Sequence, residues 1–153
     1  MITSTMRSYF SKIRSLKIGW NDRQLDEADF YGLCRRFKIT VVEMPLTTNG
    51  FYYCVKGKHF IAIDSKLDRI KKLLVMFHEF AHFLMHAPET NTTASFHGLG
   101  IKTRKEREAD TFALCALIPK SFITNKDLSE LVDEGFSSDL LEERFALYRS
   151  AGI

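Results

Sequence analysis

The sequence feature that most constrains the fold is a long predicted helix that is apolar on nearly every face. Apolar residues recur at helical spacing over residues 67–84, and nearly every position over residues 73–85 is apolar. The exceptions are His78, Glu79 and His82. A helix that is apolar on all sides belongs in a protein core, where a polar side chain is costly unless it has a partner. The sequence therefore predicts a central buried helix that carries a polar cluster.

The polar cluster has the pattern H-E-x-x-H, which is typical of a hydrolytic metal site. Residues four apart on an α-helix leave from the same face, about 6 Å apart along the axis. His78 and His82 can therefore offer two imidazole nitrogens to one Zn²⁺, and Glu79 beside them can take a proton from a water that the metal polarises. We predict His78 and His82 as metal ligands and Glu79 as the catalytic residue.

A catalytic zinc site needs a third protein ligand. One common pattern has a glycine three residues after the second histidine and another histidine six residues after it, but Met85 and Pro88 occupy those positions. The other common solution takes a glutamate from a following helix, with an acid four residues later. Glu106 and Asp110 have this spacing. We predict that Glu106 is a ligand and that Asp110 accepts the outer N–H of a ligating histidine, His78.

Two alternatives for Glu106 stay open. Residues 103–106 match a capping box, in which the glutamate turns back to the start of its own helix. Glu108 would then be a candidate for the third ligand, although it lies on a different helical face from Asp110.

The remaining histidines and two tyrosines are weaker candidates. His86 lies about 12 Å along the helix axis from the first motif histidine, too far to share one ion, so we expect helix-end packing or a contact with a ligand. His59 is expected to be an ordinary strand residue, whereas His97 is a candidate to line the cleft. Tyr52 and Tyr53 alternate along a strand, so one should pack inward and the other face out.

The rest of the sequence predicts an α+β fold, in which a small antiparallel or mixed sheet packs on a helical bundle with the motif helix at its centre. We expect a single domain over residues 1–153, with a core over about 22–122, a basic N-terminal segment over 1–21 that forms an amphipathic helix, and C-terminal helices over 123–153. The expected helices begin near Asp22, Ser65 and Thr103 and, in the acidic C-terminal part, cover residues 126–134 and 138–149; the expected strands are residues 38–44, 51–55 and 59–63, the last two joined as a hairpin at Gly57.

Composition excludes several classes of protein. The three cysteines are far apart and form no C-x-x-C pair, which favours free thiols and a reducing compartment. No apolar run approaches the roughly 20 residues needed to cross a bilayer, and the first 20 residues lack the apolar core of a secretory signal. A net charge of +3 is too small to indicate nucleic-acid binding. We expect a cytoplasmic protein without a membrane or nucleic-acid partner.

Taken together, the motifs resemble the ImmA/IrrE family of metallopeptidases. The resemblance covers about residues 22–122 and rests on the H-E-x-x-H run, on His86, on residues 106–113 leading into Leu117-Ile118-Pro119, and on the hairpin that ends at residues 60–64. Two departures from the family pattern, an alanine before His82 and the run Cys115-Ala116-Leu117, involve no predicted ligand.

The resemblance implies a zincin-like fold and a zinc-dependent endopeptidase with a gluzincin-like ligand set. Such proteins are cytoplasmic, come from bacteria, phages or mobile elements, and typically cleave a helix-turn-helix repressor to relieve transcriptional repression. One Zn²⁺ per chain is the default, although two histidines and a glutamate also suit Mn²⁺ or Fe²⁺. If the strand over residues 59–63 lies at a sheet edge, it would hold the substrate as an added strand.

Two other functions fit the sequence less well. One is a regulatory module that binds a repressor or another partner protein and carries a metal without catalysis. Structural zinc sites usually have four ligands, and Cys115, nine residues past Glu106, is poorly placed to be the fourth. The other is a DNA-associated zinc protease of the SprT type, which the pI of about 8.8 allows but the missing cysteine ribbon disfavours.

Overall fold

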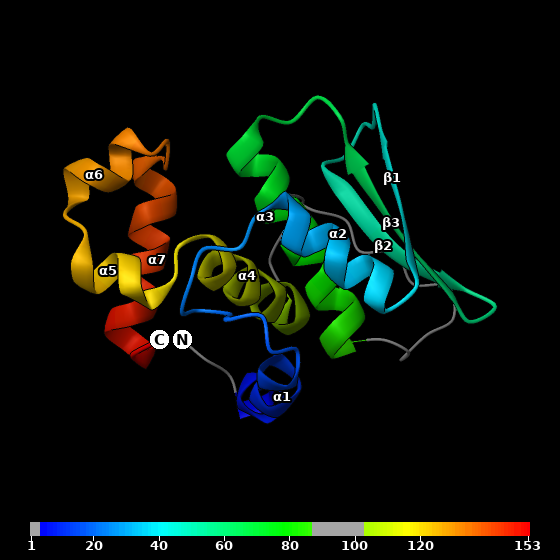
Figure 1. The fold of residues 1–153 in the computed structure, drawn as a ribbon, viewed down its shortest axis with the longest axis horizontal. Coiled ribbons are helices and arrows are strands. Elements are labelled where there is room, and N and C mark those ends of the chain that lie inside the picture. The colour runs from blue at the N-terminus through cyan, green and yellow to red at the C-terminus, as the bar shows by residue number, and fades with distance from the viewer. Residues whose placement is uncertain (1–3, 87–102) are drawn as a thin grey trace. The chain divides into compact units, whose positions relative to one another are not determined.

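The computed structural model describes residues 4–86 and 103–153, and it shows an α+β fold (Figure 1). The described residues form seven α-helices, one π-helical turn and three strands, which confirms the predicted α+β class. By contacts the chain divides into two compact units, Met1–Leu25 with Leu114–Ile153, and Asp26–Ala113. The single domain over residues 1–153 stays a prediction. His97 lies outside the described residues.

The sheet belongs to the second unit and has the strand order β1-β3-β2. Strand β1 (Ile39–Met44) runs parallel to β3 (Lys58–Asp64), and β2 (Gly50–Val55) runs antiparallel to it. The sheet is therefore mixed, as predicted. Because β3 is the central strand and is paired on both sides, the condition for substrate addition to residues 59–63, that they form a sheet edge, is not met; the edges are β1 and β2.

The β2–β3 hairpin is confirmed, and its turn explains the glycine. Val55 pairs with Lys58, so only Lys56 and Gly57 form the loop. Both have positive φ, 51° and 74°. Two successive positive φ values define the hairpin turn whose twist matches that of the flanking strands, and glycine adopts the second of them without steric cost.

Helix α2 (Glu27–Arg36) begins later than its first candidate cap, Asp22. Asp26 is the N-cap instead: its side chain accepts the N–H of Asp29, and the side chain of Asp29 accepts the N–H of Asp26, both at 2.9 Å. This reciprocal capping box satisfies two otherwise unpaired donors, an arrangement that a single aspartate at position 22 does not offer.

The motif helix likewise begins later than predicted. Helix α3 (Arg69–Ala81) is capped by Asp68, whose side chain accepts the N–H of Lys71. Ser65 was the expected cap, but its N–H donates to the carbonyl of Met44 at 3.0 Å. This bond continues the pairing of β1 with β3 by one residue, so Ser65 does not start the helix. After Ala81 the helix widens into a π-helical turn, η1 (His82–His86).

Aromatic packing holds α3 in the core of its unit. The helix packs on β2, β3 and α2, and Figure 1 shows α2 and α3 beside the sheet. Phe77 meets Phe30 of α2 edge-on with ring centroids 6.0 Å apart, and Phe80 lies 6.1 Å from Phe112 of α4 (Arg104–Leu117). All four rings are fully buried, and burying one such ring stabilises the fold by roughly 1.5–3 kcal/mol.

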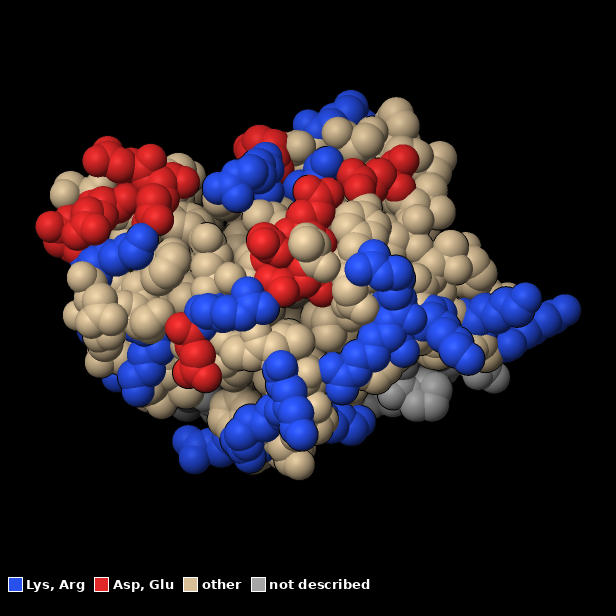
Figure 2. Space-filling view, viewed as in Figure 1, with Lys and Arg blue, Asp and Glu red and all other residues tan. Residues whose placement is uncertain are grey.

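The other unit is helical. Helix α1 (Ser4–Ser15) is the predicted basic amphipathic helix, and it buries Met6 and Ile13. The helices that follow in this unit are α5 (Lys120–Asn125), α6 (Leu128–Asp133) and α7 (Ser138–Ala151). The last two confirm the predicted acidic helices, and acidic side chains gather over them in Figure 2. Helix α5 was not predicted, because Pro119 was interpreted only as a helix stop, whereas it is the N-cap of α5.

A buried arginine joins distant parts of this unit. Arg144 is fully buried, and its guanidinium donates to the carbonyl oxygens of Ile118 at 2.6 Å and Ile153 at 2.8 Å and to Asn21 Oδ1 at 3.1 Å. Burial lowers the pKa of Arg144. No helix among the described residues is long and apolar enough to cross a membrane.

Candidate metal centre

The two motif histidines point their Nε2 atoms at each other. His78 lies in the last turn of α3 and His82 begins η1, and their Nε2 atoms are 3.0 Å apart. Both rings are buried, and Glu79 between them in the sequence is fully buried as well. The helical spacing that predicted a shared face is therefore seen in the structure.

Glu106 of α4 completes this cluster. Its Oε2 lies 3.0 Å from His78 Nε2 and its Oε1 lies 2.9 Å from His82 Nε2. Half of the predicted capping box forms as well, because Thr103 Oγ1 accepts the N–H of Glu106 at 3.2 Å. The carboxylate itself faces the histidines, so capping through the backbone leaves the side chain available for them.

The donor atoms fit a metal ion. One atom from each of His78, His82 and Glu106 lies within 4.8 Å of the others. Two ligands at about 2.0–2.1 Å from zinc, at a tetrahedral angle, are about 3.3 Å apart. The closest donor separations here are 2.9 to 3.0 Å, so a small expansion of the cluster would accommodate the ion. Two imidazoles and one carboxylate also make the donor set of a catalytic zinc site.

Asp110 lies on the far side of His78. Its Oδ1 is 2.7 Å from His78 Nδ1. An ionised carboxylate only accepts hydrogen bonds, so Nδ1 of His78 carries a proton, and Nε2 is the nitrogen that could bind a metal. This is the contact that the four-residue spacing of Glu106 and Asp110 led us to expect.

His86 and Glu108 form a second buried pair, which the sequence did not predict. His86 Nδ1 lies 2.9 Å from His82 Nδ1, and His86 Nε2 lies 3.1 Å from Glu108 Oε1. Glu108 thus contacts His86, whereas Glu106 contacts both Nε2 atoms. The i, i+4 spacing of His82 and His86 was a visible signal for the first contact, but nothing local pairs His86 with a residue 22 positions later.

The electrostatics of the cluster favour positive charge. Burial lowers the pKa of His78, but hydrogen bonds to Asp110 and Glu106 outweigh this effect and raise the pKa to about 9. Burial raises the pKa of Glu106, but hydrogen bonds from His78 and His82 reverse this and hold the pKa well below its usual range. Carboxylates that stabilise a proton on His78 would equally stabilise a metal cation.

The two tyrosines have other surroundings. Tyr52 is buried, as the alternation of the strand predicts for one of the pair, and its hydroxyl lies 2.9 Å from His59 Nδ1. Burial raises the pKa of Tyr52 to about 12. Tyr53 is half-buried and stacks on Phe60 at 4.9 Å. His59 is thus a strand residue whose polar partner is Tyr52.

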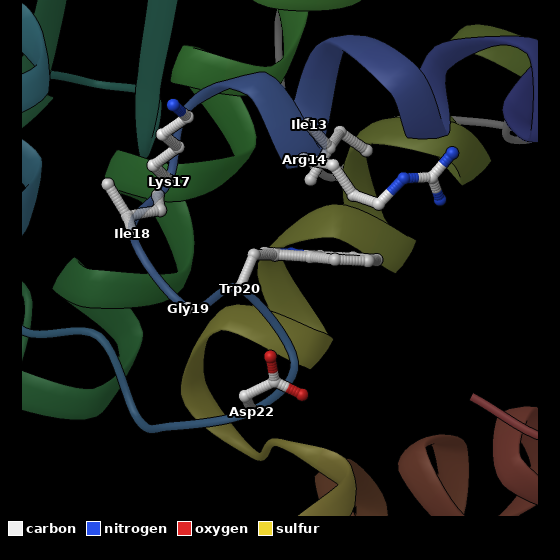
Figure 3. Close-up of a pocket in the computed structure, with 7 residues that line it drawn as sticks. All are labelled: Ile13, Arg14, Lys17, Ile18, Gly19, Trp20 and Asp22. Atoms are coloured by element: carbon white, nitrogen blue, oxygen red, sulfur yellow. The ribbon is translucent and has the colours of Figure 1, made fainter.

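A pocket of about 320 Å³ in the helical unit contains none of the clustered residues. It lies where α1 ends, and Figure 3 shows the flat ring of Trp20 within it. Its three charged residues, Arg14, Lys17 and Asp22, are all exposed. The lining residues are Ile13, Arg14, Lys17, Ile18, Gly19, Trp20 and Asp22. It therefore lacks the buried polar groups of a built site.

Fold and site together define a class of protein. A small α+β fold with a buried H-E-x-x-H helix, joined by a glutamate from the next long helix, is consistent with the zincin-like peptidases. The family model of the IrrE N-terminal-like domain, a peptidase family, matches residues 34–146, which is 113 of the 153 residues, and the chain belongs to this ImmA/IrrE family. No curated protein and no solved structure matches the chain. The family and the His-His-Glu cluster together indicate a metal-dependent peptidase that acts on protein.

Proposed function

We propose that the chain is a zinc-dependent endopeptidase that cuts a partner protein at a limited number of sites. The proposal rests on the close approach of three groups, His78 Nε2, His82 Nε2 and the Glu106 carboxylate. Glu79 directly follows His78 in the sequence. Membership of a peptidase family supports the same reaction.

His78, His82 and Glu106 would hold the ion, one per chain. When bound, zinc makes a water easier to deprotonate and draws electron density from the scissile carbonyl. Mn²⁺ and Fe²⁺ suit the same donors, and we propose zinc because three mixed nitrogen and oxygen ligands are typical of its catalytic sites.

Glu79 is the general base and acid. It directly follows a proposed ligand, and its side chain is fully buried. A carboxylate in that position can remove a proton from the attacking water and then deliver it to the leaving amine. Asp110, 2.7 Å from His78 Nδ1, keeps that ring in the tautomer that presents its Nε2 lone pair.

The proposed substrate is a helix-turn-helix transcriptional repressor, whose cleavage would relieve repression. Resemblance to the family supports this choice. The sheet edges are β1 and β2, and β1 exposes Val42 and Met44, so an extended substrate segment could add to an edge strand. That requirement would restrict cleavage to loops and linkers. Three buried free cysteines, Cys34, Cys54 and Cys115, support a cytoplasmic location.

The test combines metal analysis with cleavage. Purified protein should contain about one zinc per chain and should cut a member of a panel of purified helix-turn-helix repressors at one or two positions found by mass spectrometry. Glu79→Gln should keep the zinc and lose the cleavage, because it removes the base without removing a ligand. Glu142→Gln, an exposed change on α7, is the matched control and should cut normally.

Two results would overturn the proposal. A protein that takes up no zinc after reconstitution is not this enzyme. A zinc-loaded wild type that binds a repressor tightly but leaves it uncut would instead be the regulatory binding module. The wild type would then give the same result as Glu79→Gln.

A further inference from the structure

We propose that His86 and Glu108 are positioning residues that fix the tautomer and ring orientation of His82, through a hydrogen-bond chain from Glu108 to His86 to His82. The inference rests on the proposed metal-dependent function, because the purpose of the chain is to present His82 Nε2 as a ligand. It gives a role to two buried polar residues that the proposed mechanism does not otherwise use.

The direction of the chain follows from its carboxylate end. Glu108 is 2% exposed, and its Oε1 lies 3.1 Å from His86 Nε2. An ionised carboxylate has no proton to donate, so the proton in this bond belongs to Nε2 of His86. The Nδ1 atom of a neutral His86 then has a lone pair and can only accept.

The second bond transmits that choice to the proposed ligand. His86 Nδ1 lies 2.9 Å from His82 Nδ1. Since His86 Nδ1 accepts, His82 Nδ1 must carry a proton, and Nε2 of His82 is the nitrogen left to bind an ion. That Nε2 lies 3.0 Å from His78 Nε2 and 2.9 Å from Glu106 Oε1, at the centre of the proposed site.

The opposite tautomer of His82 could donate its Nε2–H to Glu106, but it conflicts with the contact to His86 and with metal binding. It would place two nitrogen lone pairs face to face at 2.9 Å, and it would put a proton on the nitrogen that has to bind the ion. Water is a poor substitute for the chain, because His82, His86 and Glu108 are all buried. Arg104 Nε also lies near Glu108 Oε1, but at 3.9 Å it is beyond hydrogen-bond distance, whereas His86 Nε2 at 3.1 Å is within it.

The two proposed histidine ligands are therefore oriented by different devices. His78 has a carboxylate directly on its Nδ1, that of Asp110 at 2.7 Å. His82 reaches its carboxylate only through a second imidazole. The π-helical turn η1 begins at His82 and ends at His86, so the irregular winding covers the two residues that have to meet.

The experiment separates positioning from packing by the choice of variant. His86→Phe keeps an aromatic ring but removes both nitrogens. His86→Gln keeps the connectivity, because its amide oxygen can accept from His82 and its amide nitrogen can donate to Glu108. Glu108→Leu removes the carboxylate at the end of the hydrogen-bond chain and lies in a different helix. It tests the same proposal if the variants at position 86 do not fold.

Two quantities are measured. In the zinc-loaded proteins, two-bond proton–nitrogen spectra of the imidazoles at pH 8 report which nitrogen of His82 carries the proton and which nitrogen binds the ion. In competition with a chromophoric chelator, the same proteins report the dissociation constant for zinc, and circular dichroism confirms the fold.

We expect the wild type and His86→Gln to show the Nδ1–H tautomer of His82 and zinc dissociation constants that agree within about threefold. His86→Phe and Glu108→Leu should lose that tautomer and bind zinc about 10- to 100-fold more weakly, the usual loss when the partner of a ligand is removed. An unchanged tautomer in folded His86→Phe or Glu108→Leu would overturn the inference. So would a His86→Gln that is as weak as His86→Phe.

Failure of the proposed function gives a different result. If the wild type binds no zinc, the metalloenzyme and the positioning role that rests on it are both refuted. If the wild type binds zinc and the folded variants bind it equally well, only the positioning role is refuted.

Discussion

Nε2 of His78 lies 3.0 Å from Nε2 of His82, with the carboxylate of Glu106 between 2.9 and 3.0 Å from both. Two N–H groups cannot oppose each other at that distance, so at least one of the two nitrogens presents a lone pair. The other side of each ring is bonded to a group that can take its proton, Asp110 for His78 and His86 for His82. With those protons held on the outer side, both rings can turn an Nε2 lone pair inward when a cation is bound beside Glu106.

Glu106 and Glu108 should therefore differ sharply when each is replaced by alanine. Glu106→Ala removes a proposed ligand, and zinc binding should become too weak to survive gel filtration. Glu108→Ala leaves all three proposed ligands in place, and zinc should remain near one per chain at saturating metal. Metal content after gel filtration, measured by plasma mass spectrometry, checks both. The reverse order would identify Glu108 as the ligand.

Asp110 should affect metal binding without being a ligand. Asp110→Ala leaves Nδ1 of His78 without the acceptor that lies 2.7 Å away, so the tautomer and basicity of that ring are no longer set. We expect the zinc dissociation constant to rise by about 10- to 100-fold. Asp110→Asn keeps an acceptor oxygen and should lie between Asp110→Ala and the wild type. Chelator competition gives the three values, and equal affinities would remove Asp110 from the site.

Metal should also stabilise the fold. A ligand that binds only the native state at a free concentration 100 times its dissociation constant adds about 2.7 kcal/mol to the free energy of unfolding. Thermal unfolding in zinc and in excess chelator should therefore differ by several degrees for the wild type and for Glu79→Gln. Glu106→Ala should show no such difference. A stabilisation of equal size in Glu106→Ala would mean that zinc binds elsewhere.

Glu43 should make the sheet unit sensitive to acid. The Tyr31 hydroxyl and the Lys72 ammonium, the latter at 2.9 Å, both bond to the carboxylate and lower the pKa of Glu43. A lowered folded pKa means that the stabilisation is complete above the unfolded value of about 4.3 and is lost as the pH falls through the folded value. The Glu43→Gln variant should have a lower free energy of unfolding than the wild type at pH 7. Its free energy of unfolding should also depend less on pH below about 4.3.

Urea unfolding at pH 7, 4 and 3, in chelator so that the metal site does not contribute, measures this dependence. Glu142→Gln on α7 is a matched exposed change. If the free energies of unfolding of Glu43→Gln and the wild type decrease in parallel as the pH is lowered, the contacts of Glu43 do not contribute to the pH dependence of stability.

Gly50 allows close contact of the sheet with the motif helix. A Cβ at this position would lie 2.7 Å from the carbonyl oxygen of Ala62 and 2.8 Å from Cγ1 of Val75, which belongs to α3. One of these contacts is with backbone, so the strand or the helix would have to shift. Gly50→Ala should destabilise the protein by about 1–3 kcal/mol, as overpacking usually does. Gly57→Ala is a comparison in open space whose cost comes from its positive φ alone. Chemical denaturation ranks the two.

The sequence predicted the parts of the fold that are determined by local pattern. The hairpin follows from a glycine between two β-branched and aromatic runs, and the motif helix follows from its apolar periodicity. Its cap did not, because Ser65 and Asp68 are both good N-cap residues and tertiary contacts decide between them. The same holds for Asp22 and Asp26 at α2.

Strand order and the partners of buried polar residues lie outside local pattern. A hairpin can join a third strand on either side, and only the packed structure shows that β1 pairs with β3. Arg144 directly follows two glutamates in the sequence, yet it is buried against three oxygens from distant parts of its unit. Glu106 was predictable because four-residue spacing marks a helix face, whereas the pairing of His86 with Glu108 depends on how two helices pack.

The proposed ligands come from two segments, and His82 and Glu106 are 24 residues apart in the chain. An ion held by both would be a reversible cross-link that closes a loop of that length. Closing such a loop removes conformational freedom from the unfolded chain, as a disulfide does. Cys34, Cys54 and Cys115 form no disulfide, so the metal would supply the covalent-like tie that this chain otherwise lacks. Loss of the ion would then loosen the attachment of α4 to α3 as well as stop the reaction.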